Sequence, residues 1–417
     1  MDTIAAYSTF AMTLGLMVTR PRIGLNFRLD PAAAAFLGVI VMMLFGVVHW
    51  TNLGAAALVL WRPLVGIVSI MATTAVAQRL GVLEKLASGV FAARRPEALF
   101  TRVFALSALT AATLNNDSAI LLLTPLVVVL VRRRYRRHPE LVAPFAFAVF
   151  MSAGVAPLVI SNPMNMVVAS YAKIGFNAYA LRMVPIAACG LATSFVMLRL
   201  VFRDVLAKAA DDAEPEALAS PWTSAQKQVL LLLCAVMGAY PVVSSLGGAI
   251  WPVAAVGAVL ALILAQRHSH PALSVARDIS WNIVAFLPFV FVLAIGLRNV
   301  GLVGHLEAAY ARGGMLAVGV CSALGSAILN NHPMSMINML TLVDGPGGAR
   351  QEDVLAALIG GDLGPRLFPT GSLAGLLWFE SLRRLRVEVS VGRFVIVGAL
   401  LTIPSLALSL LLLKLLS

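Results

Sequence analysis

The sequence predicts an all-α polytopic membrane protein with an inverted-topology repeat: about ten transmembrane helices, two re-entrant hairpins and two broken helices. Three observations support this prediction. Of the 417 residues, 60 % are hydrophobic and only 12 % are charged, whereas soluble globular proteins carry about 25 % charged residues. The mean hydropathy is +0.91, and apolar stretches of about 20 residues, enough to span a bilayer, follow one another along the chain. Basic residues collect in short segments between these stretches.

The basic segments predict the orientation of the chain. The net charge of +12 is interpreted as a signal of membrane topology, because basic residues mark the cytoplasmic loops. The apolar composition excludes a soluble enzyme, a secreted disulfide scaffold and a nucleic-acid binder. Cationic loops stay in the cytoplasm, so six clusters of arginine and lysine mark the inner side, within 20–28, 79–102, 132–137, 199–227, 267–277 and 383–393. We expect a multi-pass protein of the inner membrane with both termini outside the cytoplasm.

Two apolar segments must enter and leave on the same side. Residues 103–131 lie between two cytoplasmic clusters, so they predict a re-entrant hairpin that turns at Asn115-Asn116-Asp117. Residues 315–343 lie between Arg312 and Arg350 on the opposite side and turn at Asn330-Asn331-His332. The segments 107–116 and 322–331 share Ser-Ala-Leu and Leu-Asn-Asn at matching positions. This similarity predicts an inverted repeat, the architecture of many secondary transporters.

The remaining elements follow in order. The first repeat, 1–202, is expected to cross at 3–19, 32–50, 62–78, 142–172 and 183–202 around its hairpin. Residues 203–226, with acidic Asp211, Asp212, Glu214 and Glu216, are expected to form a cytoplasmic linker. The second repeat, 227–417, is expected to cross at 228–245, 249–266, 280–297, 354–382 and 394–414 around the outer hairpin.

Polar residues with proline or glycine interrupt the crossings 142–172 and 354–382, at 161–165 and at 362–372. Unwound backbone at membrane depth is tolerated where it lines a cavity or is buried in protein. Half-helix N-termini there offer free N–H groups to an oxygen-bearing solute. We therefore expect a substrate site at the breaks and hairpin turns, formed by Asn115, Asn116, Ser118, Ser161, Asn162, Asn165, Asn330, Asn331, Thr370, Gly371 and Ser372.

Three titratable residues in this region are candidates for proton coupling: Asp117, Asp362 and His332. Each also has a structural interpretation. Asp117 could cap the returning half-helix, Asp362 could form a buried charge pair with Arg366, four residues on, and His332 could be a neutral, hydrogen-bonded residue at the hairpin tip.

No set of residues has the spacing of a metal site, and we expect no metal and no cofactor. Cys189, Cys234 and Cys321 are scattered through apolar segments and read as small buried side chains. The methionines at 164, 166, 334, 336 and 339 read as packing residues rather than soft-metal ligands. An intramembrane enzyme would need paired aspartates in a protease motif, a Ser-His dyad or a His-Glu-x-x-His site. Since the sequence has none of these, we expect a transporter and not an enzyme.

Several motifs resemble those of the arsenite/antimonite efflux permeases, within the ion transporter superfamily. These are residues 116–125, 157–162, 173–176, 361–366 and 369–374, in order over nearly the whole chain. The resemblance implies export of trivalent arsenic and antimony hydroxides, driven by proton entry. It also implies two candidate partners, a cytoplasmic ATPase subunit and a second copy of the chain.

The chain departs from this family at several positions. Ser152 and Ala153 stand where the family usually has Asp-Thr, Gly361 replaces a cysteine, Arg366 a lysine and His332 an apolar residue. Relatives in the same superfamily carry dicarboxylates, citrate or sodium, so a small organic anion transporter or a sodium-coupled transporter is the alternative. Arg366 favours an anion, but Asp362 would cancel its charge and leave a site suited to a neutral polyhydroxide.

Overall fold

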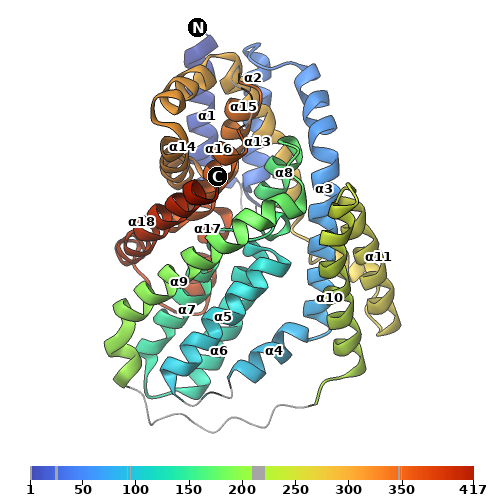
Figure 1. Cartoon of the computed structure of the whole chain (residues 1–417), viewed down its shortest axis with the longest axis vertical. Helices are drawn as coiled ribbons and strands as arrows, with labels where there is room; N and C mark the ends of the chain where they lie inside the picture. The colour runs from blue at the N-terminus through green and yellow to red at the C-terminus, as the bar shows by residue number, and fades with distance from the viewer. Residues whose placement is uncertain are drawn as a thin grey trace.

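The computed structural model describes residues 2–23, 27–91, 93, 95–208, 221–345, 348 and 350–417. Almost all of these residues are helical (Figure 1). Within these described ranges, seven helices are long and apolar enough to cross a membrane, and four shorter apolar helices accompany them. The predicted class, a helical polytopic membrane protein, is confirmed.

The N-terminal part of the chain contains nine helices in the described residues. They are α1 (Asp2–Thr19), α2 (Pro31–Leu44), α3 (Trp50–Arg79), α4 (Val82–Val90), α5 (Pro96–Leu114), α6 (Asn116–Arg134), α7 (Val142–Ser152), α8 (Pro163–Tyr171) and α9 (Phe176–Lys208). A two-stranded ribbon, β1 (Arg22–Ile23) and β2 (Phe27–Arg28), joins α1 to α2, and the 3-10 turns η1 (Pro139–Leu141) and η2 (Val159–Ser161) flank α7.

The C-terminal part repeats this order. It contains α10 (Ser224–Ser245), α11 (Trp251–Arg267), α12 (Ala272–Ala276), α13 (Trp281–Asn299), α14 (Leu302–Leu329), α15 (Asn331–Val343), α16 (Gln351–Leu363), η3 (Gly364–Arg366), η4 (Pro369–Gly371), α17 (Leu373–Arg384) and α18 (Val391–Leu416). A kink at Gly314 divides α14 into a short arm, the counterpart of α4, and a long arm, the counterpart of α5. A glycine with positive φ precedes both α4 and α14: Gly81 at φ 72° and Gly301 at φ 95°.

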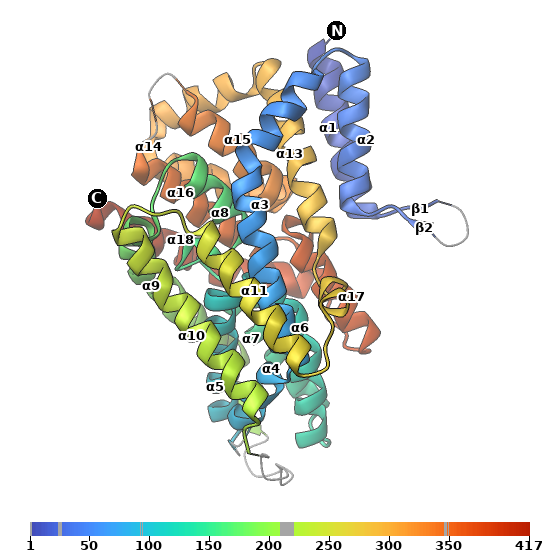
Figure 2. The ribbon, with the colours of Figure 1, turned by 90° about the vertical axis from the view of Figure 1, so that its right-hand side faces the viewer.

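Two helix pairs form the predicted hairpins. In α5–α6 and in α14–α15 the chain reverses at a single residue, Asn115 at φ 113° and Asn330 at φ 79°. Asparagine is enriched at positive φ because its short side chain can hydrogen-bond locally. The two hairpins lie at opposite ends of the molecule in Figures 1 and 2.

The helices divide into two groups whose internal contacts repeat. We call α1–α3, α10, α11 and α13 the panel, and α5–α9 with α14–α18 the site bundle. In the panel, α2 packs on α13 as α11 packs on α3 (Figure 2). In the site bundle, α17 packs on α6 as α8 packs on α15, and α9 packs on α18.

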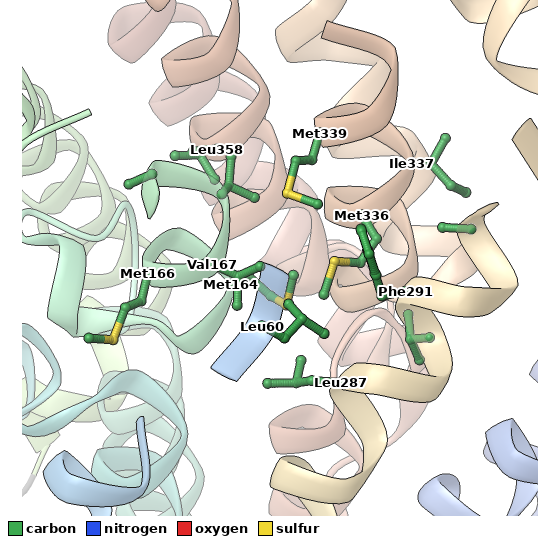
Figure 3. Close-up of a cluster of buried hydrophobic side chains, with 14 of the residues drawn as sticks. Leu60, Met164, Met166, Val167, Leu287, Phe291, Met336, Ile337, Met339 and Leu358 are labelled. Carbon is green, nitrogen blue, oxygen red and sulfur yellow. The ribbon is translucent and has the colours of Figure 1, made fainter. Parts of the chain in front are cut away.

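Packing is dense where the groups meet. Met164 and Met166 of α8 lie near Met336 and Met339 of α15 in an apolar cluster that also includes Leu60 of α3 (Figure 3). Unbranched methionines adapt to irregular gaps between broken helices. Close helix packing matters here because the hydrophobic effect does not drive helix association within lipid.

Several predicted boundaries are wrong. The second and third crossings, expected at 32–50 and 62–78, are α2 and the 30-residue α3. Arg62 does not end the third crossing, because its guanidinium lies over the Trp61 ring, 5.1 Å from the centroid, so the charge can stay at the helix surface. The inner hairpin covers 96–134 rather than 103–131, and α9 extends through the start of the expected linker to Lys208. The linker acids Asp211, Asp212, Glu214 and Glu216 lie outside the described residues.

Candidate substrate site

Four half-helices begin at the two hairpin turns and the two broken crossings: α6, α8, α15 and α17. The side chain of the residue immediately before each half-helix accepts a hydrogen bond from a backbone N–H group in the first turn of that half-helix. The bonds are Asp117 N to Asn115 Oδ1 (2.8 Å), Met164 N to Asn162 Oδ1 (3.0 Å), His332 N to Asn330 Oδ1 (3.3 Å) and Gly375 N to Ser372 Oγ (2.9 Å). These side chains are N-caps, which satisfy one backbone donor and leave the others of the turn free.

Each hairpin turn contacts the broken crossing that follows it. The Ser161 hydroxyl donates to the Ala112 carbonyl at 2.6 Å, and the Asn330 amide donates to the Thr370 carbonyl at 3.2 Å. Asn116 and Ser118 lie in the first turn of α6, and Gly371 packs against Pro365 and the Ser326 carbonyl. The predicted polar residues therefore gather in two related places, one in each half of the chain.

Asp362 joins the two halves. Its carboxylate accepts three hydrogen bonds from the first broken crossing: Ala156 N to Oδ2 (2.9 Å), Asn162 Nδ2 to Oδ1 (2.8 Å) and Asn165 Nδ2 to Oδ2 (3.0 Å). Charged acceptors form the stronger class of protein hydrogen bonds. Three protein donors compensate the negative charge of the Asp362 carboxylate. The geometry therefore favours a residue that positions the first broken crossing over one that exchanges protons freely.

Tyr179 completes this contact and is not evident from the sequence. The Asn165 amide donates to the Tyr179 hydroxyl at 2.7 Å, and that hydroxyl donates to the Ala156 carbonyl at 3.0 Å. Tyr179 is fully buried in α9. A tyrosine in an apolar helix gives no sign of its partner's position, because the partner comes from a different crossing.

The direct Asp362–Arg366 pair is not formed. In the part of the chain that the structure describes, no oxygen of Asp362 lies within 4.0 Å of an Arg366 nitrogen. The Arg366 guanidinium instead donates to the Ser194 hydroxyl of α9 at 2.9 Å and to the Met151 carbonyl at the end of α7. A helix C-terminus attracts cations, and that end of α7 is open because the helix stops there. A Cβ at Gly154 would collide with the guanidinium, so a side chain at this position would displace it.

Asp117 does not cap α6, because Asn115 does. Asp117 lies in the first turn of that helix, half-buried, and its own carboxylate has no hydrogen bond or ion pair to any described residue. It therefore differs from Asp362 in having its charge uncompensated by the protein. Such a carboxylate at a hairpin turn can take up a proton or a solute donor without first losing a protein contact.

His332 occupies the corresponding position in the outer hairpin. Its Nδ1 lies 3.2 Å from Asn330 Oδ1, and its ring packs edge-on against Phe286. Its buried Nε2 has no hydrogen-bond partner in the part of the chain that the structure describes. Two further buried polar atoms without a partner, Ser326 Oγ and Asn331 Oδ1, lie in the same hairpin. Most buried polar atoms in proteins are paired, so this turn has unused capacity to bind a polar solute.

Sulfur and metal chemistry have little support at this site. The expectation that the three cysteines are buried is wrong: Cys234 is exposed, and Cys189 and Cys321 are partly exposed, because they lie on helix faces that other described helices do not fully cover. All three are free, and none lies at a break or hairpin turn. The described residues contain no group of three His, Cys, Asp or Glu side chains that could hold a metal ion. What the site does offer is amides, hydroxyls and backbone N–H groups.

Comparisons with known proteins give a consistent result. The family model described as "Arsenical pump membrane protein" matches residues 5–416. The chain is 31 % identical to the arsenical pump membrane protein of Escherichia coli K12 over 98 % of this chain and 97 % of that protein, and 30 % identical to that of Yersinia enterocolitica with the same coverage. Its fold is similar to the crystal structure of the Alcanivorax borkumensis YdaH transporter, with a TM-score of 0.59 and 16 % identity over 99 % of this chain and 98 % of that one.

Proposed function

The chain belongs to the family of arsenical pump membrane proteins, and we propose that it exports arsenite and antimonite from the cytoplasm in exchange for protons. The observation that carries this proposal is the contrast between two acids. Asp362 is bound by three protein donors, whereas Asp117 at the inner hairpin turn has no partner in the described chain.

The hydrogen-bond donors and acceptors of the site support the proposed cargo. Trivalent arsenic and antimony hydroxides are neutral molecules whose OH groups both donate and accept hydrogen bonds. Capped half-helix N-termini, the Asn331 amide and the Ser326 hydroxyl complement such groups. Recognition through thiolates would require two or three converging sulfurs, which these turns do not contain. We therefore infer hydroxyl recognition rather than sulfur coordination.

Asp117 is the proposed proton carrier. A carboxylate at membrane depth is costly to keep charged, and its charge here is uncompensated by the protein. Proton binding from one side and release to the other would accompany the inward and outward exposure of the neutral cargo. His332, with a free Nε2 at the equivalent turn, is the second candidate, while Asp362 is reassigned from coupling to positioning.

Transport into everted membrane vesicles tests the proposal. Wild-type vesicles should accumulate labelled arsenite when the lumen is acidic, and the ionophore nigericin should abolish accumulation. Asp117→Asn keeps shape and hydrogen bonding but cannot titrate, so we expect uphill accumulation to disappear and downhill exchange to persist. Glu97→Gln, which removes an exposed acid 3.5 Å from Arg199, is the matched control and should behave as wild type.

The alternatives predict other outcomes. If succinate or citrate accumulates and arsenite does not, the organic-anion transporter stands instead. If replacing sodium by potassium abolishes accumulation, sodium is the coupling ion. The organic-anion interpretation relied on Arg366, and two donor groups of that side chain are already used by Ser194 and Met151. Association with an ATPase subunit or a second copy of the chain remains a prediction from the family resemblance.

A further inference from the structure

A large basic cavity lies away from the hairpin turns. It has a volume of about 1260 Å³ and opens between the end of α1, the β1–β2 ribbon and the segment that joins α17 to α18. The ribbon and α17 lie on the same side of the molecule in Figure 2. The lining contains five arginines, Arg20, Arg22, Arg28, Arg383 and Arg386, against two acids, Glu380 and Glu388.

The acids do not neutralise these cations. One carboxylate oxygen of Glu380 binds Arg384, outside the cavity lining, at 2.6 Å, and the other lies 4.0 Å from Arg20. Glu380 is therefore committed mainly to Arg384, a residue that does not line the cavity. The Nε of Arg20 is buried and has no hydrogen-bond partner among the described residues. The cavity therefore holds excess positive charge.

Most of the remaining lining is apolar. Val18, Leu376 and Phe379 belong to helices α1 and α17 and contribute to one wall. The α17–α18 turn also lines the cavity, and Arg132 of α6 holds this turn by donating to the Leu385 and Arg386 carbonyls at 2.5 and 2.9 Å. The arginines lie at or beside the ends of α1, α2 and α17, where a bilayer places its headgroups. The cavity thus combines cations with an apolar wall at headgroup level.

We propose that this cavity binds an anionic phospholipid, with the phosphodiester between the arginines and an acyl chain along the apolar wall. Arginine matches phosphate oxygens with its planar donors, and basic pockets between transmembrane helices are known to bind anionic headgroups. A free inorganic anion would use the arginines but leave the apolar wall unused. An acidic peptide would likewise gain nothing from an acyl-sized apolar surface.

Lipid binding by the purified full-length protein tests the proposal. In nanodiscs of dioleoyl phosphatidylcholine, added dioleoyl phosphatidylglycerol should bind and raise the unfolding temperature, detected by native mass spectrometry and by thermal unfolding. Arg28→Gln with Arg383→Gln should weaken this binding about 30-fold. Arg133→Gln with Arg137→Gln removes two exposed charges from another basic segment and should leave binding unchanged. Arg28→Lys with Arg383→Lys, which keeps the charge, should retain most of it and separates charge loss from misfolding.

Four results would overturn the proposal. Equal binding of phosphatidylglycerol by both glutamine double variants would show that the cavity is not the lipid site. Competition by glycerol 3-phosphate or inorganic phosphate as strong as that of the lipid would indicate a free-anion site, and preferential binding of an oligoglutamate peptide would indicate a protein partner. If the Arg28/Arg383 glutamine variant exports arsenite more slowly but binds lipid as the wild type does, the cavity would be part of the solute pathway instead.

Discussion

The contacts between the panel and the site bundle are asymmetric, although the contacts within each group repeat. In the outer half, α15 packs along α13, whereas its counterpart α6 makes no comparable contact with α3 in the described chain. The inner turn meets α3 through Thr74, which donates to the Leu114 carbonyl at 3.3 Å, and the outer turn meets α13 through Phe286 and His332.

The offset can be measured along the two panel helices. Thr74 lies seven residues before Gly81 and Phe286 lies fifteen residues before Gly301, the equivalent glycine. Eight residues of α-helix correspond to about 12 Å, and the two hairpin residues in contact, Leu114 and His332, are three positions apart in the aligned hairpins. Inverted repeats can exchange their conformations to open the opposite side, so we expect a second state in which the site bundle has moved on the order of 10 Å relative to the panel.

Paired cysteines on a background with Cys189, Cys234 and Cys321 changed to alanine test this expectation. Thr74→Cys with Leu114→Cys should cross-link through a short bis-methanethiosulfonate in the present state. Ala294→Cys with Leu329→Cys occupies the equivalent positions of the second half and should cross-link only in the exchanged state.

Reversing the pH gradient with saturating arsenite should shift the yield from the first pair to the second, and either cross-link should stop export until it is reduced. The reasoning fails if the second pair never reacts, or if export continues with the first pair fully cross-linked.

The remaining predictions concern the site and the topology. Asn162→Ala removes an N-cap and a donor to Asp362, so thermal unfolding in detergent should show a loss of about 2–3 kcal/mol together with lost export. Asn331→Ala removes a side chain whose Oδ1 has no internal partner, so export should be lost with a stability change below about 1 kcal/mol; equal destabilisation by both would contradict the assignment. Arg366→Met should cost about 3 kcal/mol by uncovering the Met151 carbonyl and leaving Asp362 without a nearby cation. Unchanged unfolding would show that Arg366 does not stabilise the end of α7. A cysteine at exposed Pro139 should react with impermeant maleimide only from the cytoplasm, and a cysteine at exposed Arg350 only from outside. Labelling of the cysteine at 139 from outside would contradict the re-entrant hairpin.

The sequence predicts the architecture well because the membrane imposes strict rules. Charge clusters on one side force residues 103–131 to return, and the structure places the reversal at Asn115 and Asn330, where the apolar runs are interrupted. The ends of helices were predicted less accurately. Arg62 looked like a terminus, but a stacked arginine can remain in a helix by reaching the surface.

Partners of the site residues could not be predicted. A spacing of four residues made Arg366 the obvious partner of Asp362, since such residues face each other on a continuous helix. The helix is not continuous: it changes to 3-10 geometry at Gly364, and the two side chains reach different parts of the first broken crossing. Tyr179 and Ser194 come from a helix whose sequence shows no break, so only the three-dimensional arrangement identifies them.

The charged residues of the site have different surroundings, which bears on the proposed coupling of proton movement to a neutral cargo. Arg366 stabilises the open end of α7, and Asp362 binds the amides at the start of α8, so each charge compensates a polar end of the same broken crossing. Because their charges are opposite, Asp362 and Arg366 together add no net charge to the site. Their contacts connect the second half of the chain to the first. Asp117 is outside this arrangement. We infer that its protonation can change the charge of the inner turn while the contacts of Asp362 and Arg366 persist, which lets the site bundle move as one unit in both protonation states.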